Sequence, residues 1–534
     1  MASTDLGVLA YRRRRRAWID AVITATIARH SVDGRGGIVA PMLLHEAVEF
    51  AARYDGDAVA LITEDGVLTY ADLWAEVVRI GAWVASRVAP GERIAVVSDN
   101  RAEVVALMYG APMVGVTVMF ANTRLVSAEI DALIDDVDPQ LVVGESRLLD
   151  GLKAGRATVA FDSPEFGRLD GAAGVSSRPV DVGDPAWIIH TSGTTGRPKG
   201  AVLTHRSLMA GVLATALARP LGDGDSYLFP FPLFHVAAYN VIHAHLKRRP
   251  VVLVSKFDAE VVMTLIEAHR VTTLSLAPTM ISMLLDHPSL RSYDLSSLRH
   301  IFYGASAIPL DVLRRAVAVF GCGFGQGYGM TELSGNAVFL DAQAHARAID
   351  GEEHLLAACG KPSPLVSIRL DDAGEILVRG DQVIDGYWNR PDADDDAYAD
   401  GWFRTGDIGR FDEEGYLYIV DRKKDIIVSG GENVASLEVE DVMSEHPAIG
   451  AVAVVGVPDE RWGERVVAVV VERDGHQLDE AEAVAWAKGR LAGYKRPKQV
   501  LVVEALPMNA SGKVLKREVR DLATRRLARP NSPT

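Results

Sequence analysis

One ten-residue segment, residues 191–200, combines the features that phosphate binding requires. It reads TSGTTGRPKG and holds four hydroxyls, three glycines and one lysine. Glycine lets backbone N–H groups approach an anion, hydroxyls donate further hydrogen bonds, and lysine adds positive charge. The segment therefore predicts a phosphate-binding loop, with a polar surface turn as the alternative. It is not a Walker A loop, because Pro198-Lys199-Gly200 stands where that pattern has Gly-Lys followed by Ser or Thr.

The residues before this loop predict the element that positions it. Residues 186–189, Ala-Trp-Ile-Ile, are apolar and partly β-branched, as expected of a short buried strand that leads into the loop. Helical stretches alternate with further β-branched runs at residues 93–97, 251–254 and 298–303. Such alternation is typical of an α/β core.

The last third of the chain is richer in strand-like runs. Residues 375–379 and 415–420 predict a small β-rich subdomain. A compact α+β domain is predicted after it, from two strands and a helix at residues 451–455, 466–471 and 480–491. The acidic residues 391–400 predict a solvated loop.

Composition indicates an ordinary globular enzyme. The chain has 534 residues, of which 48% are hydrophobic, enough for a large core and at least two domains. The net charge of −15 argues against a nucleic-acid partner, because phosphate backbones require a basic surface. The two cysteines, Cys322 and Cys359, form no disulfide framework, which favours the reducing cytoplasm.

Two segments bear on membrane association. Residues 104–123 carry no charge, but Gly110, Pro112 and Gly115 interrupt them, so they predict a buried helix, a turn at 113–115 and a strand at 116–120. The run Arg12–Arg16 precedes apolar residues at helical spacing up to Ile27. Residues 12–27 thus predict a basic amphipathic helix in peripheral contact with the inner face of a membrane, with a packed or loosely ordered extension as the alternative.

A series of motifs resembles the AMP-forming adenylating superfamily, which includes acyl- and aryl-CoA synthetases, amino-acid-loading adenylation domains and beetle luciferases. The motifs occur in family order at residues 191–200, 303–306 (YGAS), 328–332 (YGMTE), 401–407 (GWFRTGD), 421–425 (DRKKD), 429–433 (SGGEN) and 507–513 (PMNASGK). The resemblance covers about residues 43–523 and is strongest to bacterial fatty acid–CoA ligases.

The resemblance implies an α/β fold with a large N-terminal domain of mixed α/β layers and a small mobile α+β domain. We divide the chain into an N-terminal extension, residues 1–42, a large domain, residues 43–421, and a C-terminal lid, residues 422–534. It also implies ATP, Mg²⁺ and coenzyme A, and two half-reactions. A carboxylate attacks the α-phosphate of ATP to give an acyl-adenylate and pyrophosphate, and the thiol of coenzyme A then displaces AMP, which leaves more readily than oxide.

Residue roles follow from the resemblance. The β- and γ-phosphates would be held by Thr191, Ser192, Gly193, Thr194, Thr195 and Lys199. Glu332 would ligate Mg²⁺, a hard cation that prefers oxygen ligands, and Thr331 would bond the α-phosphate. Adenine would lie against Gly304, Ala305, Ser306 and Tyr328. Asp407 would accept the ribose hydroxyls, and Arg422 would reach the same ribose.

The C-terminal motifs imply the remaining catalytic steps. The ammonium of Lys513 would bridge the attacking carboxylate and the α-phosphate. Lys424 stands at the hinge about which the lid moves in relatives, and the pantetheine tunnel would be lined by Gly430, Gly431 and Glu432. The chain departs from the family after Asn433, where Val434-Ala435-Ser436 replaces an aromatic residue followed by proline.

Residues 231–235, Phe-Pro-Leu-Phe-His, stand where family members select the acid. Amino-acid-loading relatives carry an aspartate there, so an amino-acid substrate is not expected. His235 would gate or line the acyl tunnel, or pack as a structural histidine. The small apolar residues 236–238 favour a long or bulky hydrophobic acid. Asn240 and His243 do not fit a purely apolar tunnel.

The leading hypothesis is an ATP-dependent carboxylic acid–CoA ligase for fatty or other hydrophobic acids, of the long-chain fatty acid type. The alternatives are an aryl-acid–CoA ligase and an acyl-AMP ligase that loads a separate carrier protein. A non-catalytic relative is a further alternative, which the intact Lys513, Glu332, Asp407 and Arg422 oppose. The acid itself and the oligomeric state stay open.

Overall fold

The computed structural model describes residues 42–167, 179–191, 198–304, 308, 310–429, 431–459, 461–488, 490–508 and 514–528. The chain divides into two compact units, Met1–Ser367 with Val378–Phe403, and Ile368–Leu377 with Arg404–Thr534. The boundary predicted at residues 421/422 falls inside the second unit, and the three-part division stays a prediction. The predicted basic helix at residues 12–27 lies outside the described residues.

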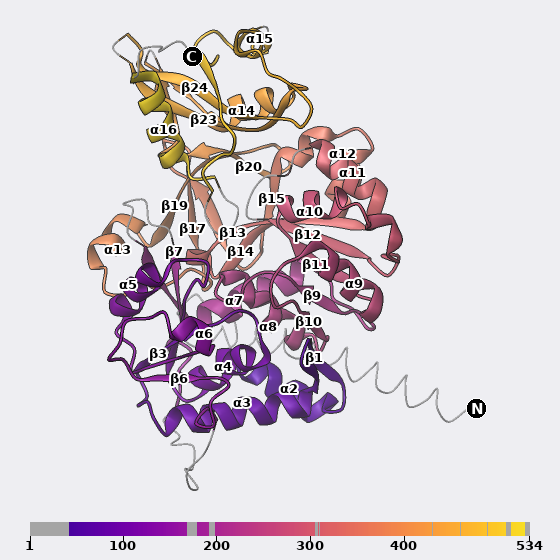
Figure 1. The fold of residues 1–534 in the computed structure, drawn as a ribbon, viewed down its shortest axis with the longest axis vertical. Helices are drawn as coiled ribbons and strands as arrows, with labels where there is room; N and C mark the ends of the chain where they lie inside the picture. The colour runs from indigo at the N-terminus through magenta and orange to yellow at the C-terminus, as the bar shows by residue number, and fades with distance from the viewer. Residues whose placement is uncertain are drawn as a thin grey trace, which may run out of the picture. The chain divides into compact units, whose positions relative to one another are not determined.

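A six-stranded sheet forms one part of the first unit (Figure 1). Its order is β6 (Thr158–Ala160), β5 (Leu141–Gly144), β3 (Arg93–Val97), β4 (Thr117–Phe120), β7 (Pro185–Thr191) and β8 (Lys199–Thr204). All neighbours are parallel except β7 and β8. Side chains alternate along β3, so Ile94 and Val96 join one buried cluster while Ala95 and Val97 join another.

Helices cover both faces of this sheet. One cluster contains α3 (Tyr70–Ala85) and α4 (Ala102–Met113), and the other contains α5 (Ser127–Val137). The shorter helices α2 (Glu46–Asp55) and α6 (Ser146–Leu149) complete this part. Because helices cover both faces of the sheet, its strands have continuous apolar runs, and these runs allowed the strands to be predicted from the sequence.

A second sheet of the first unit carries most of the predicted nucleotide motifs. Its parallel strands are β1 (Val59–Thr63), β10 (Val251–Leu253), β9 (Tyr227–Phe229), β11 (Thr273–Leu276), β12 (His300–Gly304) and β13 (Gly323–Met330). Antiparallel strands flank them, namely β2 (Gly66–Thr69), β14 (Gly335–Leu340) and β15 (Ala358–Pro362).

The two faces of the second sheet pack against different helices. On one side lie α7 (His205–Ala218) and α8 (Tyr239–Leu246). On the other lie α9 (Ala259–His269), α10 (Pro278–Leu285) and α11 (Leu310–Phe320) (Figure 1). The remaining helices are α12 (Ala342–Ile349), α13 (Pro391–Ala397) and the 3₁₀ turns η1 (Val236–Ala238), η2 (Leu290–Ser292), η3 (Thr331–Leu333) and η4 (Glu353–Ala357).

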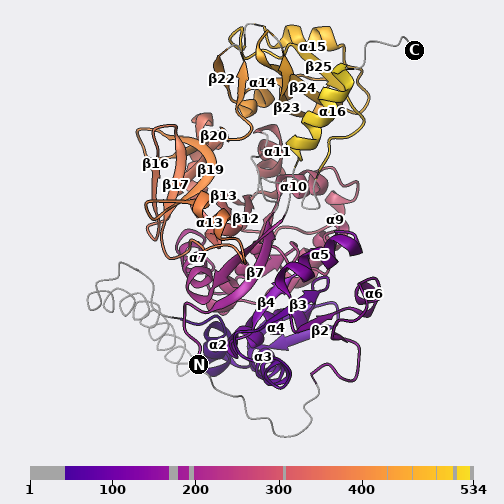
Figure 2. The same cartoon turned by 90° about the vertical axis from the view of Figure 1, so that its left-hand side faces the viewer.

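The second unit begins with neighbouring strands that Figure 2 shows side by side. They are β16 (Ser367–Leu370), β17 (Glu375–Arg379), β19 (Trp402–Phe411) and β20 (Leu417–Arg422), with β18 (Tyr398–Ala399) pairing with β19. The chain passes between the two units within β16, β17 and β19. The β-rich subdomain predicted from residues 375–379 and 415–420 is thereby confirmed.

A further sheet follows in the second unit. Its strands are β21 (Ile427–Ser429), β22 (Glu432–Val434), β23 (Ile449–Asp459), β24 (Gly463–Glu472) and β25 (Gln499–Val502). Alternate residues of β24 pack in two clusters, one with α14 (Ser436–Ser444) and α15 (Glu480–Trp486), the other with α16 (Lys516–Ala528). The predicted strands at 451–455 and 466–471 are confirmed within β23 and β24.

One predicted element was wrong, and one predicted helix was too long. The acidic residues 391–400 are not a loop, because α13 occupies Pro391–Ala397. Proline suits the first helical position, and aspartates in the first turn interact favourably with the helix dipole. The helix predicted at 480–491 ends at Trp486, ahead of a glycine at position 489 that disfavours helix.

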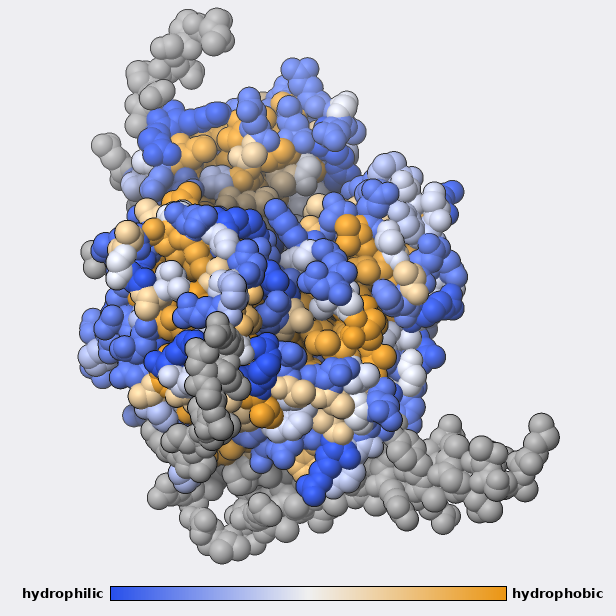
Figure 3. Space-filling model, turned by 60° about the horizontal axis from the view of Figure 1, so that its bottom comes forward, coloured by the Kyte–Doolittle hydropathy of each residue, from blue (hydrophilic) through white to orange (hydrophobic). Residues whose placement is uncertain are grey.

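The uncharged residues 104–123 form α4 and β4, as predicted, with Pro112 in the last turn of α4 and Gly115 at a φ of 77°. Within the ranges that the structure describes, no helix has the length and apolar character needed to cross a bilayer. Hydrophilic residues separate the apolar patches on the face drawn in Figure 3. The large exposed apolar residues of the first unit include Val67, Leu217 and Met283, from three different elements.

Candidate functional site

The predicted phosphate loop joins two antiparallel strands. β7 ends at Thr191 and β8 begins at Lys199, and these two residues are register partners. The predicted strand at residues 186–189 is therefore confirmed. Ser192, Gly193, Thr194 and Thr195 lie outside the described residues. The ladder brings the two ends of the loop, a hydroxyl and an ammonium, to the same end of the sheet.

Glu332 lies close to this loop. It sits in η3, the single turn that connects β13 to β14. Its Oε1 accepts a hydrogen bond from Thr191 Oγ1 at 3.3 Å and one from Tyr387 Oη at 3.0 Å. The ammonium of Lys199 lies 5.1 Å from the centre of the Tyr387 ring. The fold thus brings Thr191, Lys199 and Glu332 together around a tyrosine that sequence reasoning missed.

Tyr387 is held in place from two directions. The chain at residues 386–388 continues the edge of β8, with Trp388 N donating to Gly200 O at 2.7 Å and an isolated bridge between Tyr387 and Ala201. Its backbone N–H donates to Asp394 Oδ1 of α13 at 2.8 Å. Burial, and then the negative charge of Glu332, raise the pKa of Tyr387, so its hydroxyl stays protonated and able to donate.

The residues predicted to face adenine lie on β12 and β13. Gly304 is the register partner of Gly327, and Tyr328 follows at a partly buried position. A Cβ at Gly304 would lie 2.8 Å from Gly327 O, so the close approach of these strands requires glycine. Ala305 and Ser306 lie outside the described residues. Thr331 is buried at the start of η3.

In the second unit, Asp407 and Arg422 form an ion pair. They are register partners on β19 and β20, with Arg422 Nε 2.8 Å from Asp407 Oδ1. The Asp407 side chain is only 4% exposed. The two residues predicted to share the ribose are therefore brought together, and the arginine fixes the orientation of the carboxylate.

Glu375 supports this pair and was also missed. Its buried carboxylate accepts from Gly406 N at 3.2 Å and from Arg404 Nη1 at 3.2 Å. It also accepts from Lys423 Nζ at 2.9 Å. Glu375 thus links the segment just before Asp407 to the residue just after Arg422. The sequence placed it correctly in a strand but gave no sign of this role.

The predicted hinge residue Lys424 is exposed in the turn between β20 and β21. Asp421, three residues before Lys424, is buried and accepts a hydrogen bond from Ser436 Oγ at 2.7 Å. Farther along α14, Glu440 Oε1 forms an ion pair with Lys516 Nζ at 2.8 Å. Ser436, where the chain departs from the family pattern, therefore ties the start of α14 to the hinge.

The predicted residues near the hinge and the C-terminus are only partly covered by the described structure. Gly431 has a φ of 85° and leads into exposed Glu432, whereas Gly430 lies outside the described residues. Lys513 also lies outside them. The nearest described residues before and after Lys513, Met508 and Val514, pair in an isolated bridge. The roles assigned to these residues stay predictions.

His235 is the last residue of the segment predicted to select the acid. It is half-buried and caps η1, because its Nδ1 accepts from Ala237 N at 3.2 Å. Burial, together with the positive charge of Arg124, lowers its pKa to about 4. The ring is therefore neutral at physiological pH, with the proton on Nε2. The geometry is compatible with either predicted role, tunnel lining or structural packing.

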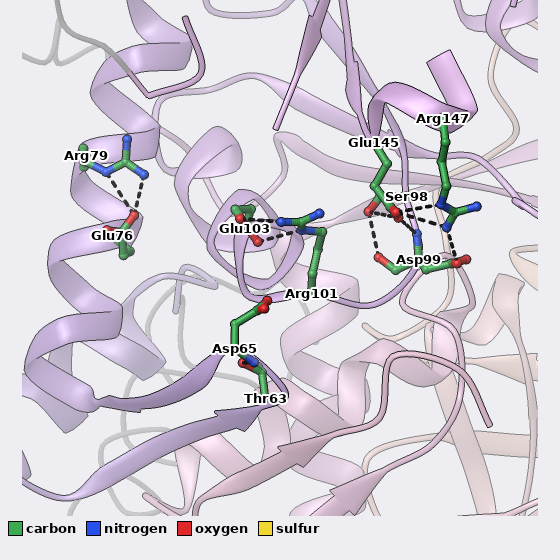
Figure 4. Close-up of polar contacts among 10 residues, drawn as sticks. All are labelled: Thr63, Asp65, Glu76, Arg79, Ser98, Asp99, Arg101, Glu103, Glu145 and Arg147. Atoms are coloured by element: carbon green, nitrogen blue, oxygen red, sulfur yellow. Dashed lines mark hydrogen bonds and ion pairs between the residues drawn. The ribbon is translucent and has the colours of Figure 1, made fainter. Parts of the chain in front are cut away.

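A polar network positions the residues before His235. Asn100 donates to Phe231 O and accepts from Leu233 N, each at 2.7 Å. The turn that carries Asn100 is itself fixed, because Glu145 Oε1 accepts from Asp99 N at 2.8 Å, and Arg147 bridges the Asp99 and Glu145 carboxylates (Figure 4). Asn100 thus holds the acid-selecting segment against the sheet.

The combined arrangement can bind a polyphosphate beside a carboxylate. It presents a hydroxyl and an ammonium at the loop ends, and a carboxylate with two hydroxyl partners next to them. In the described part of the chain, no group of three or more His, Cys, Asp or Glu side chains could hold a metal ion by itself.

Comparison with known proteins gives the family. The profile of the AMP-binding enzyme family matches residues 48–388, and that of the AMP-binding enzyme C-terminal domain matches residues 438–513. The chain is 37% identical to a feruloyl-CoA synthase from Amycolatopsis sp, over 88% of this chain and 96% of that protein. It is 34% identical to the long-chain-fatty-acid–CoA ligase FadD13 from Mycobacterium tuberculosis, over 81% of this chain and 88% of that protein.

The fold of this chain is similar to a solved structure of a CoA synthetase. It is the o-succinylbenzoate CoA synthetase MenE from Bacillus subtilis, in complex with its acyl-adenylate intermediate. Its TM-score is 0.79 at 30% identity, and the alignment covers 90% of this chain and 99% of that chain. The α/β architecture expected from the sequence is thereby confirmed. Because one profile spans more than half of the sequence and the relatives match over most of their lengths, the chain belongs to the AMP-binding enzyme family.

Proposed function

We propose that this protein is an ATP-dependent carboxylic acid–CoA ligase that forms an acyl-adenylate and then a thioester. The observation that carries the proposal is the meeting of Thr191, Lys199 and Glu332 around Tyr387. Relatives that join coenzyme A to different acids, feruloyl and long-chain fatty acids among them, support this reaction type.

The first half-reaction develops negative charge on the leaving pyrophosphate. In this proposal the Thr191 hydroxyl turns its proton from Glu332 to a phosphate oxygen when ATP binds, and Lys199 neutralises charge at the other end of the loop. Glu332 ligates Mg²⁺ together with phosphate oxygens, a donor set that this hard cation prefers. When bound, Mg²⁺ withdraws electron density from the phosphates. Tyr387 orients the Glu332 carboxylate through its hydrogen bond.

Two further residues position the nucleotide and the acid. Asp407 accepts hydrogen bonds from the ribose hydroxyls, in an orientation that Arg422 fixes. Lys513 bridges the acid carboxylate and the α-phosphate, which brings the reacting groups together and stabilises the charge that develops between them. Movement about Lys424 then exchanges Lys513 for the residues that bind pantetheine, around Gly431 and Glu432.

The substrate in this proposal is a hydrophobic acid. Long-chain fatty acids are one candidate class, supported by similarity to FadD13 and by the small side chains of residues 236–238. An aryl acid is the second candidate, supported by similarity to a feruloyl-CoA synthase. Acids of both classes, matched in carbon number, distinguish the two by their kcat/KM values.

We also propose peripheral membrane contact through residues 12–27. Its support is the sequence alone, namely five consecutive arginines before an apolar helical face. Each basic residue near an anionic surface contributes about 1 kcal/mol. Full-length protein should co-sediment with anionic vesicles at low salt and dissociate at high salt, whereas protein lacking residues 1–30 should not bind. Full-length protein that stays in the supernatant at low salt contradicts this proposal.

The proposed ligase activity is tested in two steps. Acid-dependent exchange of pyrophosphate into ATP reports adenylation, and AMP release with coenzyme A reports the complete reaction. Glu332→Gln should abolish exchange, whereas Glu353→Gln, at an exposed glutamate, should not. Exchange without transfer to coenzyme A, but with transfer to a phosphopantetheine carrier, would favour the carrier-loading alternative. Absence of exchange with every acid would favour a non-catalytic relative.

A further inference from the structure

Arg219 is a buried arginine with no acidic partner among the described residues. It follows α7 directly and is only 5% exposed. Its Nη1 makes two long hydrogen bonds, to Asn240 Oδ1 at 3.3 Å and Ser275 Oγ at 3.4 Å, and its Nε makes none. No described carboxylate lies within 4.0 Å of the guanidinium, although many other arginines of the first unit are paired in this way.

Such an arrangement is costly for folding alone. Arginine keeps its charge at any physiological pH, so burial cannot be relieved by deprotonation. The guanidinium lies 4.6 Å from the Phe302 ring centre and 5.9 Å from that of Phe339, which compensates only part of the lost hydration. A buried cation without a counter-charge therefore points to a ligand that brings one.

The surroundings of Arg219 provide space and further polar groups. A hollow of about 200 Å³ is lined by Arg219, Phe302, Gln326 and Phe339, among others. His243, one helical turn beyond Asn240 on α8, is buried, and its Nε2 makes no hydrogen bond in the described structure. Asn240 and His243 are the two residues that, from the sequence, do not fit a purely apolar tunnel. Asp341 also lines the hollow, and its Oδ1 accepts a hydrogen bond from Ala344 N.

Arg219 is also connected to the proposed nucleotide site. A Cβ at Gly327 would lie 2.8 Å from Arg219 Nη2, so the guanidinium lies against β13 at this residue. Gly327 pairs with Gly304 and immediately precedes Tyr328. Met330 lies three residues farther along the strand, about 10 Å away at the usual rise, and η3 with Thr331 and Glu332 follows. The strand that contacts the guanidinium at Gly327 thus leads directly into η3, which carries Thr331 and Glu332.

We propose that Arg219 binds a second anionic group of the substrate, a carboxylate at the end of the acid that does not react. This inference rests on the proposed acid–CoA ligase activity and refines its substrate class. The reacting carboxylate lies near Thr331 and Glu332, and the second carboxylate forms paired hydrogen bonds with the guanidinium. Asn240 and Ser275 position Arg219, and the apolar rings contact the middle of the acid. The substrate class is therefore a dicarboxylic acid with an apolar centre.

The test compares dicarboxylic acids with monocarboxylic acids of equal chain length, from short to medium. Binding is measured by calorimetry without coenzyme A, and turnover by AMP formation. The wild-type protein should favour the dicarboxylic acid about 10- to 100-fold, the range expected for a hydrogen-bonded charge pair. Arg219→Met keeps the length of the side chain but removes the charge, and should reverse this preference.

Two controls keep the result interpretable. Arg249→Met removes a buried arginine that is paired with Asp223 at 3.1 Å, and should leave the preference unchanged. Arg219→Lys keeps the charge and should retain part of the preference, which provides a second reading if Arg219→Met does not fold. A wild-type preference for monocarboxylic acids, or an equal preference in wild type and Arg219→Met, overturns the proposal.

The same experiment separates the two proposals. Turnover of monocarboxylic acids with no dicarboxylate preference leaves the ligase activity intact and rejects the role of Arg219. Arg219-dependent binding of a dicarboxylic acid without AMP formation supports the anionic site and rejects the ligase activity.

Discussion

The Tyr387 hydroxyl donates to Glu332 Oε1 at 3.0 Å, although the two residues are 55 positions apart. The same oxygen accepts from Thr191 at the end of the phosphate loop. Tyr387 is positioned by the edge of β8 and by Asp394 of α13. The carboxylate that is proposed to ligate Mg²⁺ is therefore held by two hydroxyls from separate parts of the first unit.

Tyr387→Phe should weaken adenylation without unfolding the protein. Removing a hydrogen bond to a charged group costs about 1.5–3 kcal/mol, so pyrophosphate exchange should fall about 10- to 100-fold. The loss should be accompanied by a higher Mg²⁺ requirement, because Glu332 is less well oriented. Exchange rates across a Mg²⁺ titration measure both effects. Tyr54→Phe, at an exposed tyrosine, is the control, and an unchanged Mg²⁺ dependence in Tyr387→Phe contradicts the assigned role.

The strands were the most predictable part of the fold. Residues 93–97 are buried on both faces, and such strands leave a continuous apolar run that can be read without a structure. The helix α13 was not predictable from polarity, because an acidic composition is shared by loops and by exposed helices. Its start signals, Pro391 and the first-turn aspartates, were present in the sequence.

The site was predictable where short motifs carry it, as at Thr191, Glu332 and Asp407. Tyr387, Glu375 and Arg219 were not, because their roles depend on contacts with residues far away in the sequence. Glu375, for example, accepts from Gly406, 31 positions later. Periodicity and composition report which face of an element is buried, and they do not report which distant side chain meets it.

Acid should destabilise the first unit through its buried histidines. Burial lowers the pKa of His205 and His245 to about 4 and that of His243 to about 3. Since the unfolded value is 6.5, the unfolded chain takes up protons first as the pH falls. Stability is therefore complete above about pH 6.5 and is lost between pH 6.5 and 4, by up to about 1.4 kcal/mol per pH unit for each histidine.

Urea unfolding at a series of pH values between 8 and 4.5 measures this effect. His205→Gln, which keeps an acceptor for Leu44 N, should reduce the slope below pH 6.5. His354→Gln, at an exposed histidine, should not change it. A stability that is constant from pH 6.5 to 4.5 would show that these histidines are protonated in the folded protein.

Lys424→Pro should separate the two half-reactions. Lys424 lies in an exposed turn, so the substitution removes no buried contact, but proline fixes φ and prevents rotation about a backbone hinge. Pyrophosphate exchange should survive, and AMP release with coenzyme A should fail. Glu413→Pro, in an exposed turn of the same unit, controls for a general effect of proline. Thioester formation at the wild-type rate in Lys424→Pro would place the hinge elsewhere.

Lys513→Ala should have the opposite effect on the two half-reactions. The lysine is proposed to act on charge that develops only in adenylation, and loss of one preorganised donor costs about 10²–10³ in rate. Pyrophosphate exchange should fall by that factor, while thioester formation from a pre-made acyl-adenylate should be largely retained. Acetylation of Lys513 removes the same charge and should have the same result. Lys488→Ala, at an exposed lysine of the second unit, should leave both half-reactions unchanged. Equal losses in both half-reactions of Lys513→Ala would instead indicate a structural role, because a residue that acts only in the first step cannot slow the second.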